Sequence, residues 1–82
     1  MTRYYFDMRD GDGLVPDEEG IDLPDLRSVQ IEAARSLADM ARDAVYPIPP
    51  MSETHRMVIE VRDDQGPVMD VKFSFALEKV IR

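Results

Sequence analysis

The chain has 82 residues, with seventeen acidic against ten basic side chains and a formal net charge of −7. This length predicts a single domain, residues 1–82, with a thin core, and the absence of cysteine excludes disulfides and thiolate metal sites. The acidic balance argues against binding to nucleic acid or anionic lipid, and no apolar run reaches the length of a membrane span. We therefore expect a cytoplasmic protein with neither a nucleic-acid nor a membrane partner.

The N-terminal third of the chain predicts short strands separated by turns. Residues 3–9 alternate between apolar and polar side chains, which is typical of a half-buried strand. Asp-Gly pairs in residues 10–13 favour a tight hairpin turn, and residues 14–15 begin a second strand, which Pro16 confines to a sheet edge. After the acidic turn at 17–20, Ile21 and Leu23 form a short extended piece. The first strand should direct one face to the core, with Tyr4, Phe6 and Met8. The other face should point to solvent, with Arg3, Tyr5, Asp7 and Arg9.

Residues 26–45 predict an amphipathic helix, because their apolar side chains recur at helical spacing along one stripe. Asp25 stands at the N-cap position, with Ser28 as a rival, and Pro47 ends the helix. Such a helix has to bury its stripe against another element. The stripe consists of Leu26, Val29, Ala33, Leu37, Met40, Ala41 and Ala44, widened by Ala34, Ala38 and Val45.

The C-terminal half predicts a hairpin of two strands after a mobile proline-rich loop at residues 46–55. Residues 56–62 and 69–77 alternate between apolar and polar side chains, and residues 63–66 form the turn between them. The order β-β-α-β-β then predicts an α+β fold. In this fold, a small antiparallel sheet of three to four strands carries one amphipathic helix packed on one face.

The candidate catalytic and metal-binding groups lack the partners that their chemistry requires. The acidic segment 7–19 invites a calcium site, but Leu14 occupies the position where an EF-hand needs a third oxygen ligand. Solvated turns are the favoured interpretation, with weak divalent binding as the alternative. His55, the only histidine, lies near Ser52 and Glu53, but no glycine-rich elbow holds a serine nucleophile. We predict no catalytic residue, no metal and no cofactor.

One possible partner-binding surface emerges on the sheet face away from the helix. There, Tyr5, Val58 and Ala76 lie among charged side chains. An ordinary solvated face is one interpretation, and a partner-binding or dimerising surface is the other. The second is favoured, because a sheet with one helix leaves one face and two edges uncovered.

Several segments of the chain, taken together, resemble a family of short bacterial proteins. They are Arg3-Tyr4-Tyr5-Phe6-Asp7, Asp10-Gly11-Asp12-Gly13, Asp17-Glu18-Glu19-Gly20, Leu23-Pro24-Asp25-Leu26 and Glu32-Ala33-Ala34-Arg35. The family is common in alphaproteobacteria and is described only as a domain of unknown function. The resemblance implies a shared fold and brings no activity, cofactor or catalytic residue with it.

A more distant resemblance is to HicB-type antitoxins. In that family a strand, an Asp-Gly turn and a Leu-Pro-Asp-Leu segment precede an amphipathic helix, as Asp12-Gly13 and residues 23–26 do here. The chain departs from the pattern at Arg27-Ser28, where Pro-Gly is usual, and in having two strands after the helix.

Our leading functional hypothesis is a non-enzymatic protein-binding or regulatory module that acts as a homodimer. The alternative is a HicB-like antitoxin-type module whose acidic surface neutralises a basic nuclease partner. An enzyme is the third and weakest class.

Overall fold

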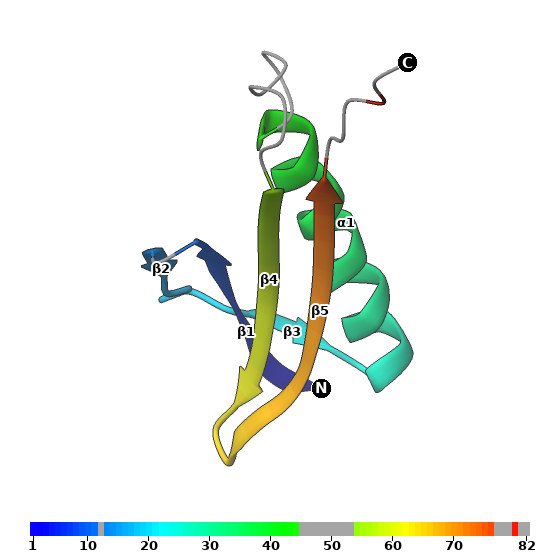
Figure 1. Cartoon of the computed structure of the whole chain (residues 1–82). Helices are drawn as coiled ribbons and strands as arrows, with labels where there is room; N and C mark the ends of the chain where they lie inside the picture. Colours follow the sequence, from blue (N-terminus) through cyan, green and yellow to red (C-terminus); the bar gives the residue numbers. More distant parts are fainter. Residues whose placement is uncertain (12, 45–53, 77–79, 81–82) are drawn as a thin grey trace.

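The computed structural model describes residues 1–11, 13–44, 54–76 and 80, and it confirms an α+β fold with one helix packed on an antiparallel sheet (Figure 1). In chain order the elements are β1 (Thr2–Asp10), β2 (Gly13–Val15), β3 (Ile21–Leu23), α1 (Leu26–Ala44), β4 (Thr54–Asp63) and β5 (Gly66–Ala76). The sheet has five strands, in the order β2-β1-β4-β5, with β3 also paired to β1. The prediction of three to four strands was therefore one short, because the extended piece that becomes β3 forms its own ladder with the start of β1.

Both predicted hairpins form in antiparallel registers. Asp10 lies opposite Gly13 in the β1–β2 pair, and Asp63 lies opposite Gly66 in the β4–β5 pair. Gly11 adopts a φ of 58°, the left-handed conformation that an Asp-Gly turn supplies at little cost. The local turn chemistry thus sets the register of both hairpins.

β2 and β3 behave as two halves of one interrupted partner strand for β1. Val15 pairs with Met8, and Ile21 pairs with Tyr4. Ile21 is six residues after Val15, whereas their partners Tyr4 and Met8 are four residues apart. The segment between β2 and β3 is therefore two residues longer than a continuous ladder requires. The two extra residues are accommodated in residues 16–20, a segment that bends away from the ladder between β2 and β3 and that we call the detour. Asp17 of the polar cluster described below lies in this detour.

The N-terminus of α1 is capped by Asp25. The amide of Ser28 donates to Asp25 Oδ1 at 2.7 Å, so Asp25 is the N-cap and the rival assignment to Ser28 was wrong. The same hydrogen bond lowers the pKa of the Asp25 carboxyl below its ordinary value. From this cap the helix runs over β4 and β5 and past the end of β3.

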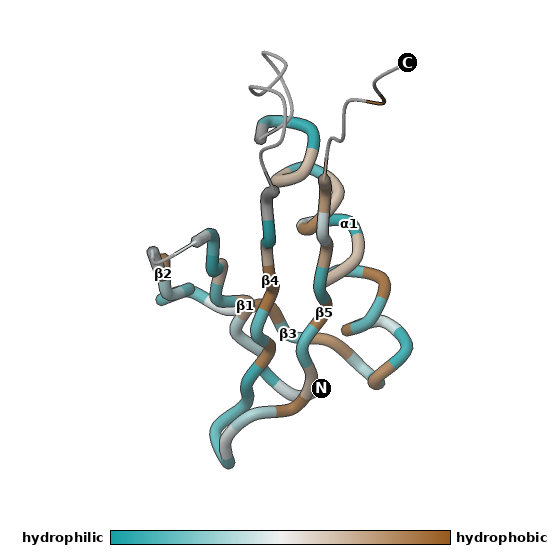
Figure 2. The backbone as a smooth tube through the Cα atoms, viewed as in Figure 1, coloured by the Kyte–Doolittle hydropathy of each residue, from teal (hydrophilic) through white to brown (hydrophobic). Residues whose placement is uncertain are grey.

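The core lies between α1 and the middle of the sheet. Figure 2 shows hydrophobic residues in the middle of β4, one of the strands that α1 contacts. The buried hydrophobic residues are Tyr4, Phe6, Val29, Ala33, Leu37, Met57, Ile59 and Val61. Leu26 is 56% exposed, and Ala34 and Ala38 are exposed as well, so the buried helical stripe is narrower than predicted. A single helix on a twisted sheet makes contact through only the centre of its apolar arc.

The predicted mobile loop at residues 46–55 lies mostly outside the described residues, as does the predicted helix end at Val45. Its last two residues were assigned wrongly, since β4 begins at Thr54 and pairs His55 with Phe75. The ladder with β5 extends the strand beyond the residues that alternate clearly in sequence.

Candidate functional site

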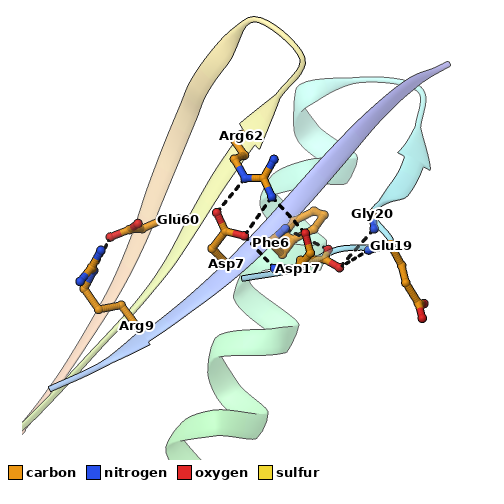
Figure 3. Close-up of polar contacts among 8 residues, drawn as sticks. All are labelled: Phe6, Asp7, Arg9, Asp17, Glu19, Gly20, Glu60 and Arg62. Carbon is orange, nitrogen blue, oxygen red and sulfur yellow. Dashed lines mark hydrogen bonds and ion pairs between the residues drawn. The ribbon is translucent and has the colours of Figure 1, made fainter. Parts of the chain in front are cut away.

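The most developed group of side chains is a polar cluster of Tyr5, Asp7, Asp17 and Arg62, which we call the Asp7–Arg62 cluster. Figure 3 shows Asp7, Asp17 and Arg62 of this cluster. Arg62 Nε donates to Asp7 Oδ2 at 2.9 Å, and the amide of Asp17 donates to Asp7 Oδ1 at 2.8 Å. Arg62 Nη2 also donates to the carbonyl oxygen of Asp17 at 3.0 Å. The guanidinium lies over the Tyr5 ring, 4.4 Å from its centroid, a favourable cation–π geometry.

The carboxylate of Asp17 takes the place of a missing strand residue. Its Oδ2 accepts from the Phe6 amide at 3.1 Å, and its Oδ1 accepts from the amides of Glu19 and Gly20 at 3.1 and 3.2 Å. Burial by itself raises the pKa of Asp17, but the three amide donors and the positive charge of Arg62 together outweigh it, so the pKa lies below its ordinary value. Asp17 therefore holds the detour between β2 and β3 against β1.

The chemistry of this cluster is structural in character. Each of the four carboxylate oxygens of Asp7 and Asp17 accepts at least one hydrogen bond. The hydrogen bond to Asp7 raises the pKa of Arg62, so this side chain stays charged. A general base needs a pKa near the working pH, whereas the pKa of Asp17 lies below its ordinary value.

The exposure of Asp7 differs from the sequence expectation. Alternation placed Asp7 on the solvated face, but it is only 8% exposed. The reason is that Arg62 and the chain at Asp17 cover it from two sides. No local signal marks this burial, because Arg62 is 55 residues away in sequence.

The predicted surface of Tyr5, Val58 and Ala76 occupies one face of the sheet without forming a contiguous patch. Tyr5 lies opposite Arg62, and Ala76 lies opposite Thr54. Along β4 each of these positions is four residues from Val58, which corresponds to about 13 Å. Charged residues lie between them, including an Arg9–Glu60 ion pair of 2.7 Å that stands apart from the Asp7–Arg62 cluster (Figure 3). The use of this face by a partner stays a prediction.

A second surface was not found from the sequence. α1 packs on β4, β5 and β3, so the apolar face of the sheet continues uncovered where β1 meets β2. Met8 was predicted to be in the core but is 36% exposed, and its cross-strand partner Val15 is 58% exposed. Beside them lies an open hollow of about 390 Å³, with apolar Phe6, Met8, Val15 and Pro16 and acidic Glu18 and Glu19 in its lining. We call these six residues the β1–β2 corner.

The described part of the chain offers little for a metal ion. Over residues 1–11, 13–44, 54–76 and 80, no group of three or more histidine, aspartate or glutamate side chains converges as a metal site. Of the other sequence candidates, Ser52 and Glu53 fall outside the described residues, and so does the side chain of His55.

These features define a small α+β protein in which one helix covers part of an antiparallel sheet. The chain belongs to the DUF6894 family, a domain of unknown function, whose family model matches residues 3–74. The resemblance to a family of unknown function noted from the sequence is thereby confirmed. No curated protein and no solved structure matches the chain. Among the described residues, α1 is too polar to cross a lipid bilayer.

Proposed function

We propose that this chain is a non-enzymatic, cytoplasmic protein-binding or regulatory module that acts as a homodimer. The observation that supports the proposal is the β1–β2 corner, where apolar side chains on the core face of the sheet are exposed because α1 does not reach them. Grouped apolar side chains around a hollow are typical of a surface that another protein covers.

The lining of the β1–β2 corner suggests the chemistry of the partner. Met8, Val15 and Pro16 offer a floor for one apolar side chain, and Glu18 and Glu19 place carboxylates beside it. With a net charge of −7 on the chain, a partner segment with an apolar residue flanked by lysine or arginine is favoured by electrostatic complementarity. The same charge disfavours nucleic acid.

The Asp7–Arg62 cluster supports a binding role over a catalytic one. Among the described residues, Asp7 is the one charged side chain that is buried, and its carboxylate accepts hydrogen bonds from Arg62 and from the amide of Asp17. A buried carboxylate used in this way stabilises the sheet beside the corner. It thereby fixes the surface that a partner would contact.

The test is affinity capture with the full chain and two matched variants, followed by identification of the retained proteins. Val15→Lys places a charge in the corner, whereas Leu14→Lys makes the same change one residue away, opposite Arg9 on the other sheet face. We expect a partner to be retained by the wild type and by Leu14→Lys, and to be lost at least about tenfold with Val15→Lys. Carbodiimide coupling should then join a partner lysine to Glu18 or Glu19.

Equal retention by Val15→Lys and the wild type would contradict a partner site at the corner. Circular dichroism of each variant checks that its fold is intact. Retention of a basic nuclease would favour the antitoxin-type alternative.

A further inference from the structure

Among the described residues, the outer edge of β5 is the longest open edge of the sheet. β5 spans eleven residues, Gly66–Ala76, and ends the strand order at the side away from β2 (Figure 1). An edge strand presents unpaired amide and carbonyl groups to any strand that can align with it. The edge at β2 is only three residues long and is followed by Pro16, which has no amide to donate. β5 is therefore the better template for adding a strand.

The sequence of β5 is complementary to itself when it is reversed about Val71. In an antiparallel pair centred on this residue, Asp70 lies opposite Lys72 of the second copy, and Lys72 lies opposite Asp70. Both side chains are exposed on the face away from α1. On the other face, Met69 lies opposite Phe73, so apolar residues meet apolar residues across the same seam.

The monomer contains a local electrostatic conflict that this pairing would relieve. Asp70 lies directly opposite Glu60 in the β4–β5 ladder, so two carboxylates are cross-strand neighbours, and of the two it is Glu60 that has the ion pair with Arg9. Like charges in that position are destabilising. In the paired arrangement, a lysine of the second copy flanks Asp70 on its open side.

We propose that a second copy of this chain pairs antiparallel with β5, with a two-fold axis at Val71. The proposal rests on the homodimer in the proposed function and specifies its interface. The ladder covers residues 69–73, because a register shift leaves Val68 unpaired in the β4–β5 ladder and Pro67 has no amide to donate. Antiparallel strands in one continuous sheet are related by an axis perpendicular to it, so both helices lie on the same face of the dimer.

A lysine on an edge strand has a simpler explanation, which is protection against aggregation. The two explanations predict different effects of charge reversal. A protective lysine needs no acidic neighbour at a fixed spacing, so reversing Asp70 should leave association unchanged. In the dimer, Asp70→Lys sets lysine opposite lysine at two symmetric positions, and Lys72→Asp does the same with aspartate.

Light scattering and sedimentation would measure the association of the full chain. A concentration range of about 10 to 300 μM suits a short ladder of micromolar affinity. We expect each single reversal to weaken dimerisation at least about fivefold, and the double variant D70K/K72D to restore it. Asp64→Lys, an exposed change of the same size in the adjacent turn, is the matched control and should have little effect.

The absence of cysteine allows the register to be read directly. Val71→Cys places two thiols opposite each other, with Cβ atoms about 4.5–5.5 Å apart, close to disulfide distance. Ser74→Cys is the control, since its two copies lie six residues apart along the seam, about 20 Å. We expect oxidation to cross-link Val71→Cys and not Ser74→Cys.

The outcomes separate this pairing from the broader proposal. A dimer that withstands both reversals and does not cross-link through Val71→Cys would overturn the β5 interface and leave the homodimer intact. A monomer at every concentration would overturn both.

Discussion

Replacing Asp17 by alanine should destabilise the fold far more than its partly exposed position suggests. The carboxylate accepts three amide hydrogen bonds, and the Phe6 amide lies in the interrupted ladder with no strand residue to replace it. A hydrogen bond to a charged group contributes about 1.5–3 kcal/mol, and a buried amide left unpaired costs about 1–3 kcal/mol. Because water can replace the acceptor for Glu19, we expect Asp17→Ala to lower the free energy of unfolding by about 2–4 kcal/mol.

This loss is large for a domain of this size, whose total stability is about 4–12 kcal/mol at roughly 0.05–0.15 kcal/mol per residue. Urea unfolding followed by circular dichroism measures it. Asp17→Asn should have an intermediate free energy of unfolding. The asparagine side chain keeps one acceptor oxygen, but its NH2 group points a donor at a backbone amide that needs an acceptor. Glu18→Ala, an exposed neighbour, should stay within about 0.5 kcal/mol of the wild type. If Asp17→Ala were as stable as Glu18→Ala, the role assigned to this carboxylate would be wrong.

Three further predictions concern the same unfolding measurement. The pKa of Asp17 is lower in the folded protein than its ordinary 3.8, so the unfolded chain takes up the proton first as the pH falls. The stability that Asp17 contributes is therefore complete only well above pH 3.8, declines as the pH falls through that value and is lost once the pH falls through the lower folded pKa, and Asp17→Asn should flatten this decline. Gly20→Ala should cost about 2–4 kcal/mol, because φ is +74° and its Cβ would lie 2.9 Å from the Arg3 side chain, whereas Gly11→Ala, with nothing within 4 Å, should cost about 1 kcal/mol. Ile59→Ala, at a fully buried position, should cost about 2–5 kcal/mol, and a smaller loss would place the core elsewhere.

The elements whose signals are local were predictable from the sequence. Period-two alternation identified the buried face of β4, and Met57, Ile59 and Val61 are each 0–1% exposed. The Asp-Gly turn and the cap at Asp25 likewise depend on neighbouring residues alone. Such features follow from the backbone preferences of a few consecutive side chains.

The features that sequence reasoning missed depend on contacts between distant segments. Alternation assigned Met8 to the core face correctly, but it carries no information on where a helix stops covering that face. Asp7 was placed in solvent because its partner Arg62 belongs to another strand. The function of Asp17 as a substitute for a strand residue was hidden for a similar reason, since an acidic turn is ordinarily solvated. The β1–β2 corner and the Asp7–Arg62 cluster both arise from these long-range arrangements.

The pairing of β1 with β4 has a consequence for how the molecule folds. Each hairpin joins neighbours in the chain, whereas the central ladder brings Tyr5 to Arg62 across the helix and most of the sequence. Closing a loop of about fifty residues costs roughly 3–4 kcal/mol of chain entropy before any contact compensates it. Each hairpin, in contrast, closes only a short turn, so the two hairpins can form quickly and independently. Formation of the β1–β4 ladder between the two hairpins, with the helix packed on one face, is therefore the slow step in forming the native sheet.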